Sequence, residues 1–562
     1  LLITFAGNLH AIYTFFKPYA NENPVPFWQL LFSPATFPNS YWYPNATRFI
    51  HNTIHEFPIY SSVVSDLHGH FLDVPFVLLI IAILLSLINP RHETRNPTVT
   101  FGPKQYQNTN VQNSFGNLNF GNWNLFRISN LGFRILLLGF ILAVMYMTNV
   151  WDGIIYFLLA VIIIAYVKYR SLIKPEGNPS IKYYLLSIMQ NKKYMTHTVF
   201  YILLIIAGFI IFSLPFNLFF KPFASGIGLL CAPDFLIKIG QIGPLMFEKD
   251  HCQHSPFWQL LILYGFFYFW AISFIIFLCR LVISSSLSLR AEGLRAKPEG
   301  SHKILRFAQN DINKSDIFVL ILIAISTLLI IIPEFIYVKD IYPAHYRANT
   351  MFKLVYQAFI MLSLSSGYII IRLLISWKLE VRSWKFIYWI SGGTGLVIVF
   401  IYPYLAINSY FGNLKTYHGL DGTKYLKNLY PTDYEAISWI NKNIKGQPVI
   451  LEAQGDSYTD YARVSSNTGL PTVLGWTVHE WLWRGTYDIP SPRIAEVQTL
   501  YETENIDDTK KLIDKYKIQL VFIGNLEKEK YPKLNEDKFK KLGKAIYQNG
   551  DTKIYRLDSS LK

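Results

Sequence analysis

The chain repeatedly carries uninterrupted apolar stretches of the length that crosses a lipid bilayer. A transmembrane helix needs about 20 predominantly apolar residues. Eight stretches qualify, and a ninth is cut off by the start of the sequence. The stretches are residues 1–16, 72–89, 133–149, 153–168, 198–216, 257–283, 316–337, 354–377 and 386–407. The sequence therefore predicts a polytopic α-helical membrane protein with about nine transmembrane helices.

The overall composition agrees with this interpretation. Of 562 residues, 51% are hydrophobic and only 16% are charged, whereas a soluble globular protein carries about 25% charged residues. Three cysteines are too few for a disulfide-rich secreted scaffold or a structural zinc ribbon. Because the sequence begins at Leu1, without a methionine and inside an apolar stretch, we expect a fragment or a processed chain.

The net charge of +15 is concentrated in the apolar part of the chain. Residues 411–562 hold 22 Lys plus Arg against 20 Asp plus Glu, so the remaining 30 basic and 17 acidic residues account for +13. Basic residues beside apolar helices usually mark the cytoplasmic side of a membrane. We therefore expect membrane lipid, and no nucleic acid, among the partners of this chain.

Basic residues also divide the loops into two sets. Twenty Lys and Arg lie in loops 90–132, 168–197, 280–315 and 376–385, and eight lie in the alternate loops 17–71, 150–152, 217–256 and 338–353. This asymmetry predicts that the first set is cytoplasmic and the second is outside. It also predicts a multi-pass protein of the cell membrane whose polar tail is extracytoplasmic. Residues 286–312 form a polar cytoplasmic insertion to which we assign no function.

Two domains are predicted, a multi-span membrane domain over residues 1–410 and an extracytoplasmic α/β domain over residues 411–562. In the tail, Thr432 and Glu435 form a capping box that opens an amphipathic helix ending at Ile444. A strand over 448–453, a helix over 507–517 and strands over 519–524 and 553–557 follow. This alternation favours a largely parallel sheet.

The first outer loop supplies the main candidates for catalysis. Asp66, His68 and His70 lie within five residues, directly before an apolar stretch. Such a group can coordinate a divalent cation, or act as acid and base near an anionic lipid head group. The alternative is a helix cap with interfacial histidines. We favour function, because an unpaired charge beside a membrane segment is energetically expensive. Glu56 and Arg48, from the same loop, join the candidate set.

Two further outer turns carry charge. Asp152 lies in the tight turn Asn149–Gly153 and is either a second acidic ligand or a helix N-cap. Arg347 and Lys353 can clamp a phosphate group, or they snorkel at the interface. The short tract from His251 to His254 has metal-ligand residue types, but it lacks a partner motif, and we interpret it as incidental.

The tail contains a cluster of charged and aromatic side chains. Indole faces stack on sugar rings, and carboxylates and guanidinium groups bond to sugar hydroxyls. The cluster is either an acceptor-binding site or the seam that docks the tail on the membrane domain. Its members are Glu452, Arg463, Trp476, His479, Glu480 and Arg484.

Five motifs occur in the order typical of one family. They are YWYPNATRFI, HEFPIYSSVVSDLHGHFLDVPF, TNVWDG, RANTMFKLVYQA and LEAQGDSYTDYARVSSNTGLPTVLGWTVHEWLWRG. The chain resembles the Chlor_Arch_YYY membrane proteins, domain of unknown function 2298, over nearly its whole length. Family members carry an acidic first outer loop and consecutive tyrosines upstream, and this chain starts after both.

The resemblance implies similarity to class C (GT-C) glycosyltransferases, which transfer a sugar from a polyprenyl-phosphate donor at the outer face. In class C enzymes the first outer loop usually supplies the catalytic acid or base, so the absent upstream loop makes Asp66 and Asp152 second-best candidates, as metal or phosphate partners rather than the base. From the residues themselves we take Asp66, His68, Asp152 and Glu56 as the candidate catalytic residues, and Arg48, Arg347, Lys353 and His70 as the candidate ligands of the donor phosphate. The cofactor is unknown, with Mg²⁺ or Mn²⁺ as candidates. The alternative function is a transporter or flippase of lipid-linked glycan, which should place ionisable residues deep in the membrane.

Overall fold

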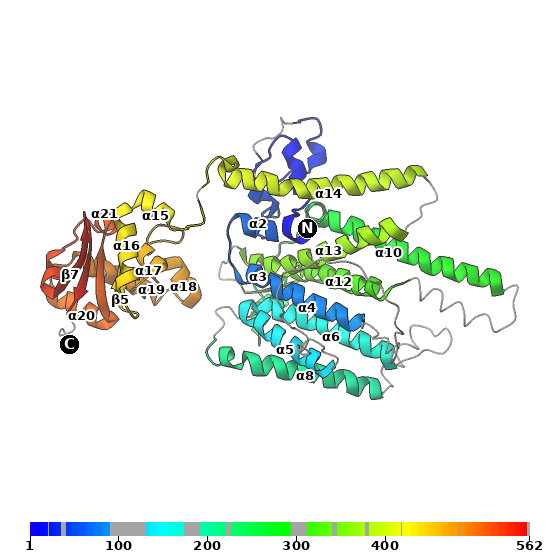
Figure 1. Cartoon of the computed structure of the whole chain (residues 1–562), viewed down its shortest axis with the longest axis horizontal. Helices are drawn as coiled ribbons and strands as arrows, with labels where there is room; N and C mark the ends of the chain where they lie inside the picture. Colours follow the sequence, from blue (N-terminus) through cyan, green and yellow to red (C-terminus); the bar gives the residue numbers. More distant parts are fainter. Residues whose placement is uncertain are drawn as a thin grey trace, which may run out of the picture. The chain divides into compact units, whose positions relative to one another are not determined.

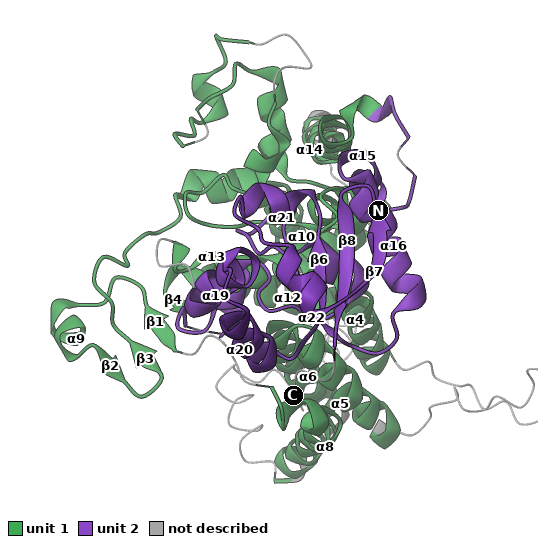
Figure 2. Ribbon diagram, turned by 90° about the vertical axis from the view of Figure 1, so that its left-hand side faces the viewer, with its two compact units in different colours: residues 1–221, 226–413 green, residues 222–225, 414–562 purple. Residues whose placement is uncertain are grey.

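The computed structural model describes residues 1–558 except 21, 35–40, 90–130, 173–191, 221–225, 294–311, 340–344, 377–381, 418 and 485. Most of the predicted insertion 286–312 therefore lies outside the described residues. The chain divides into two compact units (Figure 2). Unit 1 comprises Leu1–Lys221 and Gly226–Asn413, and unit 2 comprises Pro222–Ser225 and Leu414–Lys562.

Unit 1 is a bundle of apolar helices that lie side by side (Figure 1). Six helices in the described part of the chain are long and apolar enough to cross a membrane, and two more are apolar but shorter. The long helices are α6 (Val150–Leu172), α8 (Lys192–Asn217), α10 (Phe257–Gly293), α12 (Lys314–Ile331), α13 (Ala348–Ser376) and α14 (Arg382–Tyr410), and the shorter ones are α4 (Val74–Ile88) and α5 (Leu131–Thr148).

The count of nine transmembrane helices is not confirmed, because residues 1–16 do not form one helix. Helix α1 (Leu2–Phe5) ends before an extended segment, and the 3-10 helix η1 (Leu9–Phe15) follows. Two residues break the apolar run. Gly7 touches the ring of Tyr402, where a Cβ would lie 2.6 Å from the side chain. The Asn8 side chain accepts from the His10 amide and donates to the Ala46 carbonyl.

The remaining elements of unit 1 are short and lie in the loops. They include the 3-10 helices η2 (Phe27–Gln29), η3 (Tyr43–Ala46) and η7 (Ile332–Glu334), and the helices α2 (Pro58–Val63), α3 (Gly69–Leu72) and α9 (Asp234–Ile239). A small sheet has the order β2-β3-β1-β4. Its strands are β1 (Ile227–Leu229), β2 (Gln241–Ile242), β3 (Leu245–Met246) and β4 (Ile336–Val338).

A disulfide closes the segment that follows β1 and contains α9, β2 and β3. It joins Cys231 to Cys252, whereas Cys279 on α10 is free. In the neighbouring tract, His251 Nδ1 bonds the Tyr337 hydroxyl at 2.5 Å, and His254 lies 3.7 Å from a carboxylate oxygen of Glu334. Disulfides persist in oxidising compartments. The bond therefore favours an extracytoplasmic position for this sheet.

Unit 2 is built around a mixed four-stranded sheet of order β5-β6-β8-β7. Strand β5 (Val449–Leu451) is parallel to β6 (Ile518–Ile523), whereas β8 (Thr552–Leu557) is antiparallel to both β6 and β7 (Gly543–Asn549). The helices of unit 2 are α15 (Lys424–Leu429), α16 (Pro431–Asn443), α17 (Arg463–Thr468), α18 (Thr477–Arg484), α19 (Pro490–Glu502), α20 (Ile506–Tyr516), α21 (Asn525–Lys530) and α22 (Asp537–Leu542).

Two sequence-based expectations for unit 2 were wrong. The sheet is not largely parallel, because β7 and β8 form a hairpin whose turn contains Gly550 with φ of 55°. The expected capping box does not form either. Helix α16 begins at Pro431, and the Asp433 carboxylate is bound to Arg463 and Thr552.

The expected topology can be tested by labelling with a membrane-impermeant maleimide. Ser65→Cys and Tyr458→Cys, introduced singly into a Cys279→Ser chain, should both react in intact cells, because the outer loops carry eight basic residues against twenty. Ser315→Cys at the other end of the bundle is the control and should react only after permeabilisation. Reaction of Ser65→Cys without Tyr458→Cys, or the reverse, would contradict a shared outer side.

Candidate functional site

The loop that contains Glu56 and Asp66, predicted to be an outer loop, is folded back on itself by its own polar contacts. The backbone amide of His55 donates to the Thr47 carbonyl at 2.8 Å, and the Arg48 guanidinium pairs with Glu56 at 2.7 Å. After α2, Ser65 takes a left-handed conformation with φ of 57°, and the Asp66 amide donates to the Ser61 carbonyl at 2.9 Å. These contacts place Asp66 close to the carboxylate of Glu56, which lies just before α2.

Glu56, Asp66 and His70 form one cluster. One candidate ligand atom from each of the three lies within 4.8 Å of the others. Glu56 and His70 are buried, and Asp66 keeps 22% of its side chain exposed. Oε2 of Glu56 and both ring nitrogens of His70 have no hydrogen-bond partner. Buried polar atoms are normally satisfied, so this group is incomplete without a further partner.

Burial and nearby positive charge keep the imidazole of His70 neutral. Burial between Phe352 and Tyr356 of α13, whose ring centroids lie 4.3 and 4.6 Å away, lowers the pKa of His70 to about 3, and Lys353 lowers it further. Burial also raises the pKa of Glu56, while the Arg48 guanidinium opposes that shift. A neutral imidazole offers a lone pair to a metal ion at physiological pH.

A second pair of carboxylates lies beside this cluster. Asp73, the residue before α4, and Asp152, in the first turn of α6, are both 0% exposed, and none of their four carboxylate oxygens has a hydrogen-bond partner. Burial and the neighbouring Asp152 carboxylate raise the pKa of Asp73. The side chains of Asn149 and Gln357 also interact with Asp152.

A close backbone contact brings these loops together. A Cβ at Gly69 would lie 2.2 Å from the carbonyl oxygen of Thr148, so α3 rests directly on the turn between α5 and α6. Only glycine fits such an approach. Asp152 was expected from the sequence and Asp73 was not, although Asp73 lies at the start of the apolar stretch 72–89, directly before α4, and is as close to a membrane segment as Asp66.

The predicted phosphate clamps have different environments. Arg347 is 1% exposed, pairs with Glu334 at 3.0 Å and donates to the Ser255 hydroxyl at 3.2 Å, so its charge is used within the fold. Lys353 lies in the second turn of α13 and acts electrostatically on His70. Arg48 is 42% exposed and reaches both Glu56 and an adjacent cavity.

That cavity has a volume of about 500 Å³, and its lining carries basic side chains on one side and one carboxylate, that of Glu22. Arg48, His51 and His345 line it, together with Ala348 and Asn349 at the start of α13. A helix amino terminus carries partial positive charge and favours anions. The pair of Arg48 and Glu56 therefore connects the carboxylate cluster to a cavity suited to an anionic group.

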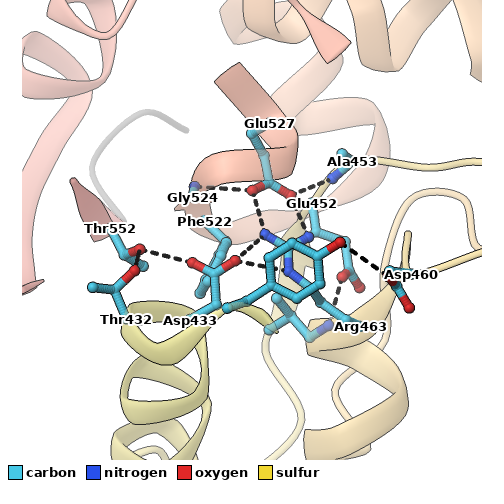
Figure 3. Close-up of polar contacts among 12 residues, drawn as sticks. Thr432, Asp433, Glu452, Ala453, Asp460, Arg463, Phe522, Gly524, Glu527 and Thr552 are labelled. Carbon is cyan, nitrogen blue, oxygen red and sulfur yellow. Dashed lines mark hydrogen bonds and ion pairs between the residues drawn. The ribbon is translucent and has the colours of Figure 1, made fainter. Parts of the chain in front are cut away.

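In unit 2, two of the predicted acceptor ligands are structural. Arg463 is fully buried between Asp433 and Glu527, at 2.6 and 2.8 Å from its Nη2 (Figure 3). Glu452 is 1% exposed and accepts from the amides of Val464 and Ser465 at the start of α17. Neither side chain is available to bind a ligand at the surface.

The other predicted acceptor ligands meet around a surface pocket of unit 2. Trp476, His479 and Glu480 line a cavity of about 460 Å³ with Trp483, which is 68% exposed. Nδ1 of His479 bonds the Ser457 hydroxyl at 2.5 Å, and Arg484 joins this group through its bond to Glu480 at 2.7 Å. Aromatic faces and hydrogen-bonding groups thus meet in one place.

The cluster of Glu56, Asp66 and His70 fits a divalent cation. Two carboxylates and one imidazole, with unsatisfied ligand atoms, suit Mn²⁺ better than Mg²⁺, which prefers oxygen ligands alone. His68, bonded through Nδ1 to Asp66, is 68% exposed. Its Nε2 therefore remains for a substrate or water.

The sequence matches the pattern of a known family over residues 1–362, described as uncharacterized membrane protein (DUF2298). No curated protein matches the chain. Among solved structures, the Archaeoglobus fulgidus oligosaccharyltransferase in the apo form is 10% identical with a TM-score of 0.28. The archaeal oligosaccharyltransferase AglB from the same organism, in complex with an inhibitory peptide and a dolichol-phosphate, is 11% identical with a TM-score of 0.27. Each match covers 88% of this chain but only 57% of the other, and TM-scores of this size do not establish a common fold.

The buried ion pairs of Arg463 generate a stability prediction. Arg463→Ala should destabilise unit 2 by about 3–5 kcal/mol, because it leaves the carboxylates of Asp433 and Glu527 buried without a counter-charge. Hydrogen–deuterium exchange of β5 and β6 in the purified full chain measures the change. Lys511→Ala, which breaks an exposed pair with Asp508, is the control and should leave exchange unaltered. Equal protection in both variants would contradict a stabilising role for Arg463.

Proposed function

The chain belongs to the DUF2298 family of uncharacterized membrane proteins, and from this premise we propose that it is a membrane-embedded glycosyltransferase that uses a polyprenyl-phosphate-linked sugar donor. The observation that supports the proposal best is the convergence of Glu56, Asp66 and His70 beside a basic cavity. The reaction serves the assembly of cell-surface glycan or glycoprotein, at the outer face of the cell membrane.

The basic cavity receives the donor phosphate in this proposal. Arg48 supplies a guanidinium fork, which matches phosphate oxygens geometrically, and the start of α13 supplies backbone dipoles. Lys353 adds positive charge near His70. Arg347 is not included, because it is 1% exposed, whereas Arg48 is 42% exposed and lines the cavity.

Glu56, Asp66 and His70 would hold a divalent cation. Such a cation neutralises charge on the phosphate leaving group. His68 takes the proton of the acceptor hydroxyl on its Nε2, while Asp66 orients the imidazole through Nδ1. The bond between the anomeric carbon and the phosphate oxygen breaks, a bond from that carbon to the acceptor oxygen forms, and polyprenyl phosphate leaves.

Asp73 and Asp152 act as positioning residues in this proposal. Both are fully buried, so they do not reach a substrate without rearrangement. Their place is behind the cluster, where α3 and the α5–α6 turn meet. The same buried pair is the observation that favours the second candidate, a flippase or transporter of lipid-linked glycan, since ionisable residues inside helix bundles often line transport pathways.

The acceptor is assigned to the pocket of unit 2. Trp476 and Trp483 provide faces on which a sugar ring stacks, and His479 and Glu480 provide hydrogen bonds. Arg484 holds the Glu480 carboxylate in place. The acceptor in this proposal is therefore a glycan or glycosylated chain.

Cation binding offers a direct test. Purified protein should bind one Mn²⁺ per chain, observed by electron paramagnetic resonance, and Asp66→Asn should weaken binding by at least about tenfold, the equivalent of roughly 1.4 kcal/mol. Asp234→Asn removes a carboxylate from an exposed position in another outer loop and is the matched control. If Asp234→Asn and Asp66→Asn bind Mn²⁺ equally well, the cluster is not a cation site.

Sugar transfer tests the activity. Radiolabelled lipid-linked sugar is supplied to vesicles that contain the complete protein, and transfer to endogenous acceptor is measured. His68→Gln should lower turnover by about 10²-fold or more with little change in KM for the donor, because it removes the proton acceptor and no donor contact. His197→Gln on α8 is the control. Trp476→Ala should raise KM for the acceptor and leave donor binding unchanged.

Each contrary result in this assay has a defined meaning. Undiminished transfer in His68→Gln removes the Asp66 loop from the mechanism. Translocation of labelled glycan across the vesicle membrane without any transfer favours the flippase.

A further inference from the structure

A second cavity lies at the opposite end of unit 1 from the carboxylate cluster. It has a volume of about 700 Å³. It is formed where α4 ends, α12 begins and the last turns of α13 pass, at the end of the bundle that carries the basic loops. Its lining residues are Asn89, Asn313, Lys314, Ser315, Tyr368, Ile371, Arg372 and Ile375.

One side of this cavity is cationic and polar. Lys314 contributes positive charge and takes part in no ion pair among the described residues, whereas the guanidinium of Arg372 is paired with Asp316. Arg372 Nε donates to Asp316 at 3.2 Å, and the Tyr368 hydroxyl donates to the same carboxylate at 2.6 Å. Because Asp316 is 0% exposed, it holds the guanidinium in a fixed place at the cavity wall.

The beginning of α12 adds to the positive potential. This helix has 18 residues and starts with a capping box in which Asn313 and Asp316 satisfy backbone amides. The side chain of Asn89, at the end of α4, donates to the Ser315 hydroxyl at 3.0 Å and closes the floor of the cavity. A helix amino terminus next to two basic side chains favours an anionic ligand.

The other side of the cavity is apolar and faces outward. Ile371 and Ile375, one turn apart on α13, line the cavity and are 60% and 78% exposed. Leu374, beside them, is 61% exposed. In a membrane protein such side chains contact lipid tails. A ligand that spans both sides needs a charged head and an apolar tail.

We propose that this cavity binds the head group of an anionic phospholipid from the leaflet on the side of the basic loops. The phosphate lies between Lys314 and Arg372 at the start of α12, and an acyl chain lies along Ile371 and Ile375. The cytoplasmic leaflet is rich in anionic lipid, and basic pockets between helix ends on that side are suited to it. This inference goes beyond the proposed function and does not depend on it.

The apolar wall distinguishes a lipid from a soluble anion. A free phosphate would use the cationic side alone and gain nothing from Ile371 and Ile375. A phospholipid gains contacts from both sides and is already concentrated in the membrane. The occupant is therefore a lipid head group rather than a metabolite.

Native mass spectrometry of the full chain, released from micelles that contain defined lipids, tests the proposal. One phosphatidylglycerol should remain bound in preference to phosphatidylcholine. Lys314→Gln should weaken retention about fivefold, the change expected for the loss of one basic residue near an anionic lipid. Lys339→Gln removes the same charge from an exposed residue at the other end of the bundle and should have no effect.

A double variant separates a loss of lipid binding from a loss of folding. Arg372→Gln combined with Asp316→Asn removes the ion pair without leaving a buried charge, and it should lose lipid preference while its elution volume in size-exclusion chromatography stays unchanged. Equal retention of the two lipids by the unaltered chain would overturn the proposal. Equal losses in Lys314→Gln and Lys339→Gln would do the same, and so would displacement of phosphatidylglycerol by millimolar inorganic phosphate.

Discussion

A hydrocarbon interior offers no hydrogen-bond partner to a polar side chain, and this constraint orders unit 1. Its ionisable groups gather at the two ends of the helices, with Glu56, Asp66 and His70 at one end and Asp316 and Arg372 at the other. At each end the groups are held by loops and by the first or last turns of helices, which is where water and lipid head groups are within reach. The two candidate sites follow from this arrangement.

The site formed by Glu56, Asp66 and His70 lacks hydrogen-bond partners that other buried charges in this chain have. Arg463 shows what satisfied buried charge looks like in this chain, since it is bound by the carboxylates of Asp433 and Glu527 at 2.6 and 2.8 Å. By contrast, His70 and Asp73 have buried atoms without partners. This difference within one molecule is the physical ground for placing a ligand near His70 and none near Arg463.

The sequence predicted the apolar helices well because hydrophobicity is a local property. Helix α20 and strands β5 and β6 were also predicted to within a few residues. The roles of charged residues were harder to predict, because they depend on partners far away in the chain. Arg463 donates a hydrogen bond to Glu527, which is 64 positions later in the chain, and Arg347 donates one to Ser255, which is 92 positions earlier. No local pattern distinguishes such an arginine from one that binds phosphate.

The small sheet of unit 1 also constrains how the membrane helices are threaded. Strand β1 precedes α10 and strand β4 follows α12, yet the two strands pair directly, with Ile227 opposite Val338. The chain must therefore cross the bilayer an even number of times between them. During synthesis, β1 cannot pair with β4 until α10 and α12 have both been inserted. The β1–β4 pairing therefore forms only after the chain has returned to the side of the membrane on which β1 lies.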